Sequence, residues 1–353
     1  MSKRSAGTGA RPPSDARGTG EDELLSPTDT VSEALAQGRG RGAHQPLKIP
    51  PSGWWDVLRR VFARINEENV GVLAAGSAFY AMLAIFPALG AIVTLYAYVS
   101  DPSDVQALFD RIAGILPPDV ADIFNEQLTS LASREQQQLG LGVLVGVLFA
   151  VWSARRGVDA LVRAVTVAYR EREDRGFIRM NLLTYGLTLG AVMVVLTTLA
   201  LLVILPTVIE WLPMSSQLTS LTRTGSWAVF VIMIMTAIGV LYRLAPPRRP
   251  ARWRWLSIGA STATLLWVAG SAGFSFYVTN FGSYNETYGT LGAIIVLLLW
   301  FYLTAYAILL GAMINAELEL QTVRDTTVGG PRPFGERGAV VADTLGKVAG
   351  EQG

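Results

Sequence analysis

The residues best placed to do chemistry form a charged cluster in the middle of the chain. Residues 152–163 read WSARRGVDALVR. In a helix, Arg156 and Asp159 are three residues apart and Asp159 and Arg163 are four apart, so these side chains can pair on one face. Arg155 and Arg156 fall at membrane depth if the preceding stretch crosses a bilayer, and a guanidinium there either extends to the headgroups or faces an aqueous cavity. The cluster is therefore a candidate site for an anion or a lipid headgroup, with snorkelling arginines as the alternative.

Hydroxyl groups gather near a proline in an earlier apolar stretch. Pro87 lies near the middle of residues 69–100, where a proline removes one backbone hydrogen bond and is expected to kink or break a helix. Ser77 and Tyr80 precede it within three turns. They are candidates to line a cavity with hydroxyls, and the alternative is a simple kink that neighbouring helices fill.

Polar residues also mark the end of the last apolar stretch. Residues 311–317 read GAMINAE, so Asn315 and Glu317 lie at the edge of the predicted membrane segment. Glu317 is expected to pair with Arg155 or Arg156, which would tie two helix ends together.

The composition identifies the elements that must position these groups. Of 353 residues, 51% are hydrophobic and 16% are charged, with a mean hydropathy of +0.37, whereas a soluble domain carries roughly a quarter charged residues. Six stretches contain no charge at all: 69–100, 136–154, 181–209, 224–242, 255–285 and 287–316. A hydrocarbon core about 30 Å thick needs about 20 apolar helical residues to cross it. The sequence therefore predicts an all-α integral membrane protein with six transmembrane helices.

The loop charges predict an orientation. The loop 101–135 carries two arginines against seven acids, whereas the loop 243–254 carries five arginines and no acid. Because Lys and Arg mark the cytoplasmic side, both termini are expected in the cytoplasm. The external loops then sum to −6 and the cytoplasmic segments to +7.

Amphipathic segments and tails flank the predicted spans. Trp54, Leu58, Val61, Phe62 and Ile65 share one helical face, which predicts a helix in the headgroup plane. Two further amphipathic helices are expected outside, within 105–112 and 120–131. Residues 1–50 are rich in Gly, Pro, Ser and mixed charges and are expected to be a disordered cytoplasmic tail. The membrane domain is expected over 51–322, and 323–353 as a flexible cytoplasmic tail.

Four short motifs connect the chain to a known family. They are AAGSAFY at 74–80 followed by Phe86-Pro87, Trp152-Ser153 with Arg156-Gly157, Tyr242-Arg243 with Pro246, and YGTLG at 288–292 leading to LWFY at 299–302 and LGA at 310–312. In this order they resemble the YihY/BrkB family of bacterial inner-membrane proteins, formerly labelled ribonuclease BN. The resemblance covers about residues 55–322 and implies a six-helix bundle with cytoplasmic termini. It also implies links to serum resistance, a virulence trait, and to movement of lipids or lipid-linked material. The long N-terminal tail departs from the family pattern.

The old ribonuclease label conflicts with the residues. Metal-dependent RNA hydrolysis needs a cluster of His and carboxylate ligands. The chain has no cysteine, its one histidine is His44 in the predicted tail, and no acid lies inside a predicted membrane segment. We therefore expect no enzyme activity, no catalytic residue, no cofactor, no metal and no nucleic-acid partner.

Two classes of function remain open. The first is transport or flipping of a lipid or amphiphilic anion, and the second is a non-transporting membrane scaffold or regulator of the cell envelope. An ion channel is disfavoured because no ring of charges or filter-like segment is visible. Membrane lipids are the expected partners, with envelope proteins or a second copy of the chain left open. The substrate-path candidates are Ser77, Tyr80, Pro87, Arg155, Arg156, Asp159, Arg163, Tyr288, Asn315 and Glu317.

Overall fold

The computed structural model describes residues 27–99, 136–201, 216–281 and 290–348. Within these ranges the regular elements are all helical. They are α1 (Pro27–Ala36), the 3-10 helix η1 (Pro46–Lys48), α2 (Pro51–Glu67), α3 (Val70–Val99), α6 (Gln136–Ala168), α7 (Phe177–Leu199), α9 (Ser216–Leu244), α10 (Trp253–Phe281), α12 (Thr290–Glu319) and α13 (Val340–Asp343). The all-helical class is confirmed.

The long helices coincide with the uncharged stretches of the sequence. In the described part of the chain, α3, α6, α7, α9, α10 and α12 each contain most of one such stretch. Among the described residues, three segments are suited by length and hydropathy to cross a membrane: Phe177–Thr198, Thr224–Leu244 and Ile294–Glu319. The pair α2 and α3, bent by 64°, provides a fourth if it is one span. These segments support a membrane protein, and the count of six crossings stays a prediction.

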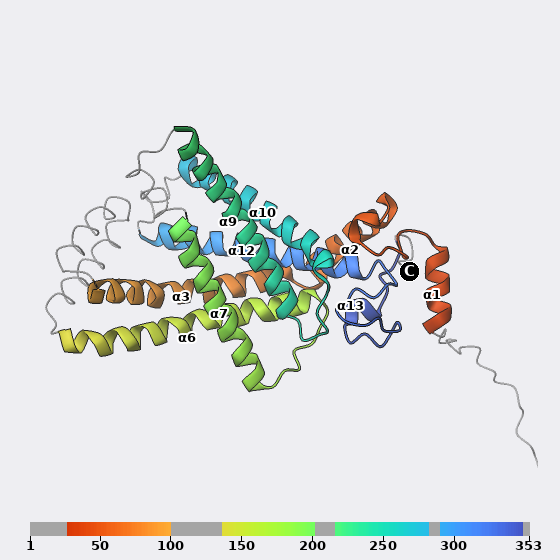
Figure 1. The fold of residues 1–353 in the computed structure, drawn as a ribbon, viewed down its shortest axis with the longest axis horizontal. Coiled ribbons are helices and arrows are strands. Elements are labelled where there is room, and N and C mark those ends of the chain that lie inside the picture. Colours follow the sequence, from red (N-terminus) through yellow and green to blue (C-terminus); the bar gives the residue numbers. More distant parts are fainter. Residues whose placement is uncertain (1–26, 100–135, 202–215, 282–289, 349–353) are drawn as a thin grey trace, which may run out of the picture.

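The long helices contact one another in a closed order. Helix α3 packs along α6, α6 touches α7, α7 touches α9, and α9 packs on α10. Helix α12 then packs against both α10 and α3. In Figure 1 the ends of α9 and α10 lie apart from those of α3 and α6 on the side away from α13.

The hydrophobic core lies toward the end of the bundle that carries α2 and α13. Its buried members include Ala74 near the start of α3, Val165 near the end of α6, Leu256 near the start of α10, and Leu309 and Met313 near the end of α12. The loop charges predict that this end is cytoplasmic. The core therefore lies at the positively charged end of the bundle.

Helices α10 and α12 approach each other closely at two glycines. A Cβ at Gly259 would collide with the Gly311 carbonyl oxygen and with Asn315, and a Cβ at Gly311 would collide with the Gly259 carbonyl oxygen. Small residues let helix backbones meet in this way. A Cβ at Gly273, on the same helix α10, would meet no atom within 4 Å, so a small residue alone does not identify a contact.

Helix α2 has two apolar faces. Val57 and Val61 are buried and pack with Leu318 of α12, whereas Trp55 and Phe62 are exposed. The helix predicted from the sequence is present, although part of its apolar stripe faces the bundle. Its position in the headgroup plane stays a prediction, and the two external amphipathic helices lie outside the described residues.

The expectation of unstructured tails differs from the structure at both ends. In the C-terminal segment, Val323, Thr326 and Val341 are buried. The N–H of Val323 donates to the Arg41 carbonyl (2.8 Å), which joins it to the N-terminal segment. The part of the chain from 27 to 50 likewise contains α1 and η1. Both segments are therefore folded in the described residues, largely through backbone hydrogen bonds that composition does not reveal.

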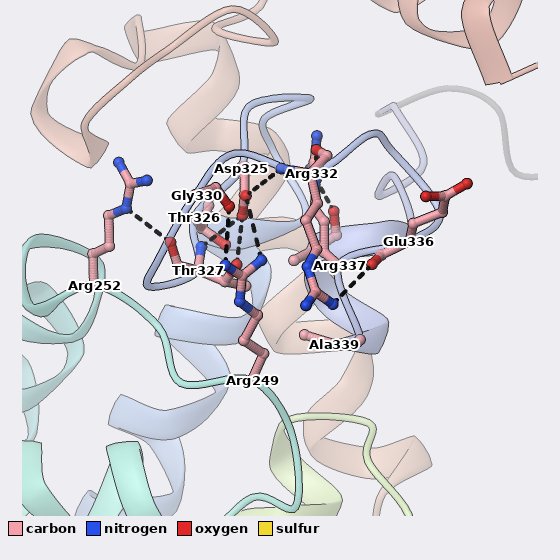
Figure 2. Close-up of polar contacts among 12 residues, drawn as sticks. Arg249, Arg252, Asp325, Thr326, Thr327, Gly330, Arg332, Glu336, Arg337 and Ala339 are labelled. Atoms are coloured by element: carbon pink, nitrogen blue, oxygen red, sulfur yellow. Dashed lines mark hydrogen bonds and ion pairs between the residues drawn. The ribbon is translucent and has the colours of Figure 1, made fainter.

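Figure 2 shows how the C-terminal segment is held against the loop between α9 and α10. The Arg252 Nε donates to the Thr327 carbonyl (2.8 Å), and the Arg249 Nη2 donates to the Gly330 carbonyl (2.9 Å). Asp325 accepts from the Thr327 hydroxyl (2.6 Å) and from the Arg332 N–H (3.0 Å). The segment thus covers the cytoplasmic ends of the helices under the predicted orientation.

Candidate functional site

A groove of about 350 Å³ lies between α3 and α6 and collects five of the predicted site residues. Ser77 and Tyr80 line it from α3, and Arg156, Asp159 and Arg163 line it from α6. Tyr80 is 38% exposed, so the groove opens to the surface of the bundle. Two separate sequence clusters therefore line one groove.

Helical spacing explains why these residues meet. Ser77 and Tyr80 are three apart, and Arg156, Asp159 and Arg163 recur at intervals of three and four, so each set lies on one face of its helix. Three of the other lining residues are small, namely Gly76, Ala160 and Ala164. The small residues leave the space that the longer polar side chains surround.

The two helices nearly touch at the inner end of the groove. A Cβ placed on Gly157 would meet the Cα and N atoms of Ala81 at 3.4 Å. This contact holds Arg156 at the level of Tyr80. The glycine after the arginine pair thus positions the charge cluster.

The charges of the groove are only partly neutralised. The Arg163 Nε donates to Asp159 Oδ2 (3.1 Å), with the Arg163 side chain 56% exposed and the Asp159 side chain 25% exposed. Of the two ion pairs predicted from the spacing, this one is confirmed. Arg156 lies over the Trp152 ring instead, with its Cζ 4.8 Å from the ring centroid. Two guanidinium groups and one carboxylate give the groove a net charge of +1.

The hydroxyl of Ser77 contributes an acceptor. Its Oγ donates to the Leu73 carbonyl of the same helix (3.0 Å), which leaves the oxygen lone pairs available. Pro87 lies inside α3, which continues from Val70 to Val99 without a break, and it does not line the groove. The groove therefore arises from helix packing rather than from a proline break.

Arg155 faces away from the groove. Its Nη1 donates to Thr184 Oγ1 of α7 (3.1 Å), and its Cζ lies 5.3 Å from the Tyr185 ring centroid. The side chains of these neighbouring arginines thus extend from different faces of α6. Arg155 joins α6 to α7 and Arg156 faces the groove.

Glu317 belongs to a buried ion-pair cluster. It is fully buried and accepts from Arg60 (2.6 Å), Arg64 (3.0 Å) and Arg170 (2.9 Å). The expectation that it pairs with Arg155 or Arg156 is wrong. Its partners come from α2 and from the turn after α6. The sequence signal that could have indicated this cluster is the i,i+4 spacing of Arg60 and Arg64, which places both on one helical face.

Asn315 has a structural partner as well. Its Oδ1 accepts from the Gly259 N–H (2.7 Å), and its Nδ2 donates to the Leu256 carbonyl (3.1 Å). It therefore joins α12 to α10 and does not line the groove. Tyr288, the remaining candidate, lies outside the described residues.

A second buried ion pair, between Arg248 and Glu319, was not predicted from the sequence. Arg248 donates to Glu319 through Nη1 (3.2 Å) and Nη2 (2.6 Å), and both side chains are buried. The Arg248 Cζ also lies 4.6 Å from the ring centroid of Tyr169. Burial raises the pKa of the Tyr169 phenol well above its ordinary value, and the charge of Arg248 offsets part of this rise. The tyrosine stays protonated at neutral pH.

The described residues contain no cluster suited to a metal ion. No group of three or more His, Asp or Glu side chains is positioned to hold one within the described ranges. The charged clusters that are present consist mainly of arginine. Their chemistry is that of anion binding and ion pairing.

The apolar helices and their arginine-rich ends define an all-helical membrane protein. The family model described as virulence factor BrkB matches residues 61–333. The chain therefore belongs to the BrkB family.

Relatives from several bacteria support this assignment. The ribonuclease-like protein YfkH of Bacillus subtilis (strain 168) is 32% identical over 266 residues, which cover 74% of this chain and 94% of YfkH. A UPF0761 membrane protein of Psychromonas ingrahamii is 28% identical over 269 residues, covering 75% of this chain and 88% of that protein. A UPF0761 membrane protein of Cronobacter sakazakii is 27% identical over 269 residues, covering 74% and 88%. No solved structure matches the chain.

Proposed function

We propose that this BrkB-family membrane protein transports or flips a lipid or an amphiphilic anion, and that the groove between α3 and α6 binds it. The observation that carries the proposal is the convergence of Arg156, Asp159 and Arg163 with Ser77 and Tyr80 in one groove. Guanidinium groups bind phosphate and carboxylate through paired hydrogen bonds. Charged groups at membrane depth are costly and commonly mark a substrate path.

The proposed setting is the bacterial inner membrane. Residues 51–322 form the membrane domain in this proposal, with six crossings and both termini in the cytoplasm. The charge difference between the two sets of loops supports this orientation. A reporter fused after Arg249 is expected to signal from the cytoplasm, and an external signal would overturn the orientation.

A scaffold or regulator of the cell envelope is the second candidate. The observation that favours it is the folded C-terminal segment, in which Val323 and Arg337 are buried while the loop around Arg332 is exposed. Such a segment offers a cytoplasmic surface for a protein partner. Enzymatic activity is not part of either proposal, although the relative YfkH has a ribonuclease-like name.

Reconstitution separates these candidates. The purified protein is placed in vesicles with a fluorescent phospholipid, and translocation is followed by bleaching of the outer leaflet. Wild type is expected to translocate faster than empty vesicles, and the Arg156→Ala, Asp159→Ala double variant to lose about tenfold, which corresponds to ~1.4 kcal/mol.

The control is Arg179→Ala, because Arg179 is exposed on α7 away from the groove. It is expected to behave as wild type. If wild type translocates no more lipid than empty vesicles, the transport proposal is wrong and the scaffold is favoured.

A further inference from the structure

We propose that the groove between α3 and α6 is a binding site for the phosphodiester headgroup of a membrane phospholipid, whose acyl chains lie along the same two helices. The inference names the ligand of the groove that the proposed function uses. It concerns binding, which can be measured whether or not the ligand is then moved.

The charge of the groove fits a singly charged phosphate. Arg156 and Arg163 supply two positive charges, and Asp159 holds Arg163 through a 3.1 Å ion pair. The remaining charge of +1 complements a phosphodiester, which carries one negative charge. A phosphate monoester carries about −1.5 to −2 at neutral pH and would place its second charge near the Asp159 carboxylate. Asp159 is therefore the residue that makes the groove prefer a singly charged headgroup over a doubly charged one.

The level of the arginines along α6 fits a headgroup. Arg163 is five residues from the end of α6 at Ala168, which corresponds to about 8 Å at 1.5 Å per residue. Arg156 is two turns deeper, about 10 Å along the axis. The interfacial layer is roughly 5–8 Å deep on each side of the hydrocarbon core. The uncharged stretch 136–154 ends just before Arg155, so it places Arg156 at the boundary with the apolar region. Arg163, about 10 Å further along the axis, then lies near the outer side of the interfacial layer.

Exposed apolar side chains lie on both helices beyond Arg156. Gly157 of α6 lies beside Ala81 of α3, so this contact relates positions on the two helices. Past this point Leu83 on α3 is 49% exposed, and Phe149 and Trp152 on α6 are 54% and 42% exposed. The rings of Phe149 and Trp152 stack with centroids 5.5 Å apart. This apolar surface begins where the charges end, as the acyl chains of a lipid require.

The proposal is tested by native mass spectrometry of the detergent-purified protein titrated with phosphatidylglycerol. The Arg156→Ala, Arg163→Ala double variant is expected to bind it at least about tenfold more weakly than wild type, a loss of ~1.4 kcal/mol. The matched control is the Arg179→Ala, Arg254→Ala double variant, because both residues are exposed on other helices. Equal loss in both double variants, or none in the groove variant, would overturn the proposal.

A second arm tests the charge rule. Asp159→Asn removes the carboxylate and is expected to raise the ratio of phosphatidic acid to phosphatidylglycerol bound, since the groove then carries +2. An unchanged ratio would overturn the role of Asp159. Lysine variants at 156 and 163 keep the charge and are expected to retain part of the binding, which excludes misfolding as the cause of the alanine result.

A third arm distinguishes a lipid from a soluble ligand. Glycerophosphoglycerol carries the phosphodiester headgroup without acyl chains and is expected to compete only weakly with phosphatidylglycerol. Competition at equal concentration would overturn the lipid part of the proposal. Binding in wild type without translocation would reject the proposed transport alone, whereas translocation with no binding loss in the groove variants would reject this inference alone.

Discussion

The arginines of the α3–α6 groove and those of the buried ion-pair cluster around Glu317 and Glu319 belong to one residue type but have different surroundings. The Arg163 side chain is 56% exposed and has one described carboxylate partner. The side chains of Arg64 and Arg248 are 3% and 2% exposed and pair with the fully buried Glu317 and Glu319. The exposed arginines can meet a ligand, whereas the terminal guanidinium nitrogens of the buried ones already donate to groups of the protein.

The difference has a physical basis. A buried charge is stable only when it is paired and hydrogen-bonded, and removing one partner leaves a charge without compensation. An exposed pair is screened by water and contributes little. Substitutions should therefore affect stability at the cluster and ligand binding at the groove.

The largest effect is expected at Glu317. Glu317→Gln leaves Arg60, Arg64 and Arg170 without their shared carboxylate, and the free energy of unfolding should fall by about 3–5 kcal/mol. Thermal unfolding in detergent measures this. Glu336→Gln, at an exposed position, is the control and should leave the melting temperature unchanged. A change at Glu317 no larger than at Glu336 would contradict the structural role of the cluster.

The next largest effect on stability is expected at the α10–α12 contact. There the helix backbones pack closely, whereas α3 and α6 leave a groove between them. Gly259→Ala must separate the helices because its Cβ would collide with Gly311 and Asn315, at a cost of about 1–3 kcal/mol. Gly273→Ala, on the same helix with open space around it, should be neutral or stabilising. Thermal unfolding of the two variants compares them directly, and equal behaviour would argue against the close approach.

A smaller effect is expected at Arg163. Removal of an exposed i,i+4 pair costs about 0.3–0.5 kcal/mol, so Arg163→Ala should unfold almost as wild type does. Its phosphatidylglycerol binding should nevertheless decrease. A loss of stability as large as that of Glu317→Gln would show that the groove arginine is structural. It would contradict the difference between the groove arginines and the buried cluster arginines.

The smallest effect is a pH dependence in the loop between α6 and α7. Arg175 donates to the Glu173 carboxylate at 2.6 and 2.7 Å, and this hydrogen bonding holds the pKa of Glu173 below its usual value. The contribution to stability is therefore present above the unfolded pKa, about 4.3, and is lost as pH falls through the lowered folded pKa. At neutral pH the free energy of unfolding of wild type should exceed that of Glu173→Gln by a few tenths of a kcal/mol. The difference should disappear in acid; a difference that persists there would contradict the assignment.

The groove could be predicted from the sequence further than the cluster could. The spacing of Arg156, Asp159 and Arg163 follows the helical repeat, so their common face and the Asp159–Arg163 pair were predictable. That this face meets Ser77 depends on which helices are neighbours, and local spacing does not contain this. Glu317 was assigned the wrong partner because Arg60 reaches it across 257 positions of the chain.

The folded end segments were hidden from composition for another reason. Arg337 donates to the carbonyls of Val323 (2.6 Å) and Ala342 (2.7 Å), and Asp343 accepts from the N–H groups of Gly335 and Gly338 (both 2.9 Å). A polar segment of this kind is ordered by specific hydrogen bonds to backbone. Its apolar content alone predicts disorder.

The joining of the two end segments has a consequence for the biosynthesis of the protein. Arg41 donates to the Gly346 carbonyl (2.6 Å), 305 positions later in the chain. Arg60 and Arg64 likewise meet Glu317 only after the last long helix has been made. A ribosome-bound chain therefore carries these arginines without their partner until synthesis is almost complete. A chain truncated before α12 exposes them permanently, and it offers the membrane quality-control proteases a feature that the finished protein does not have.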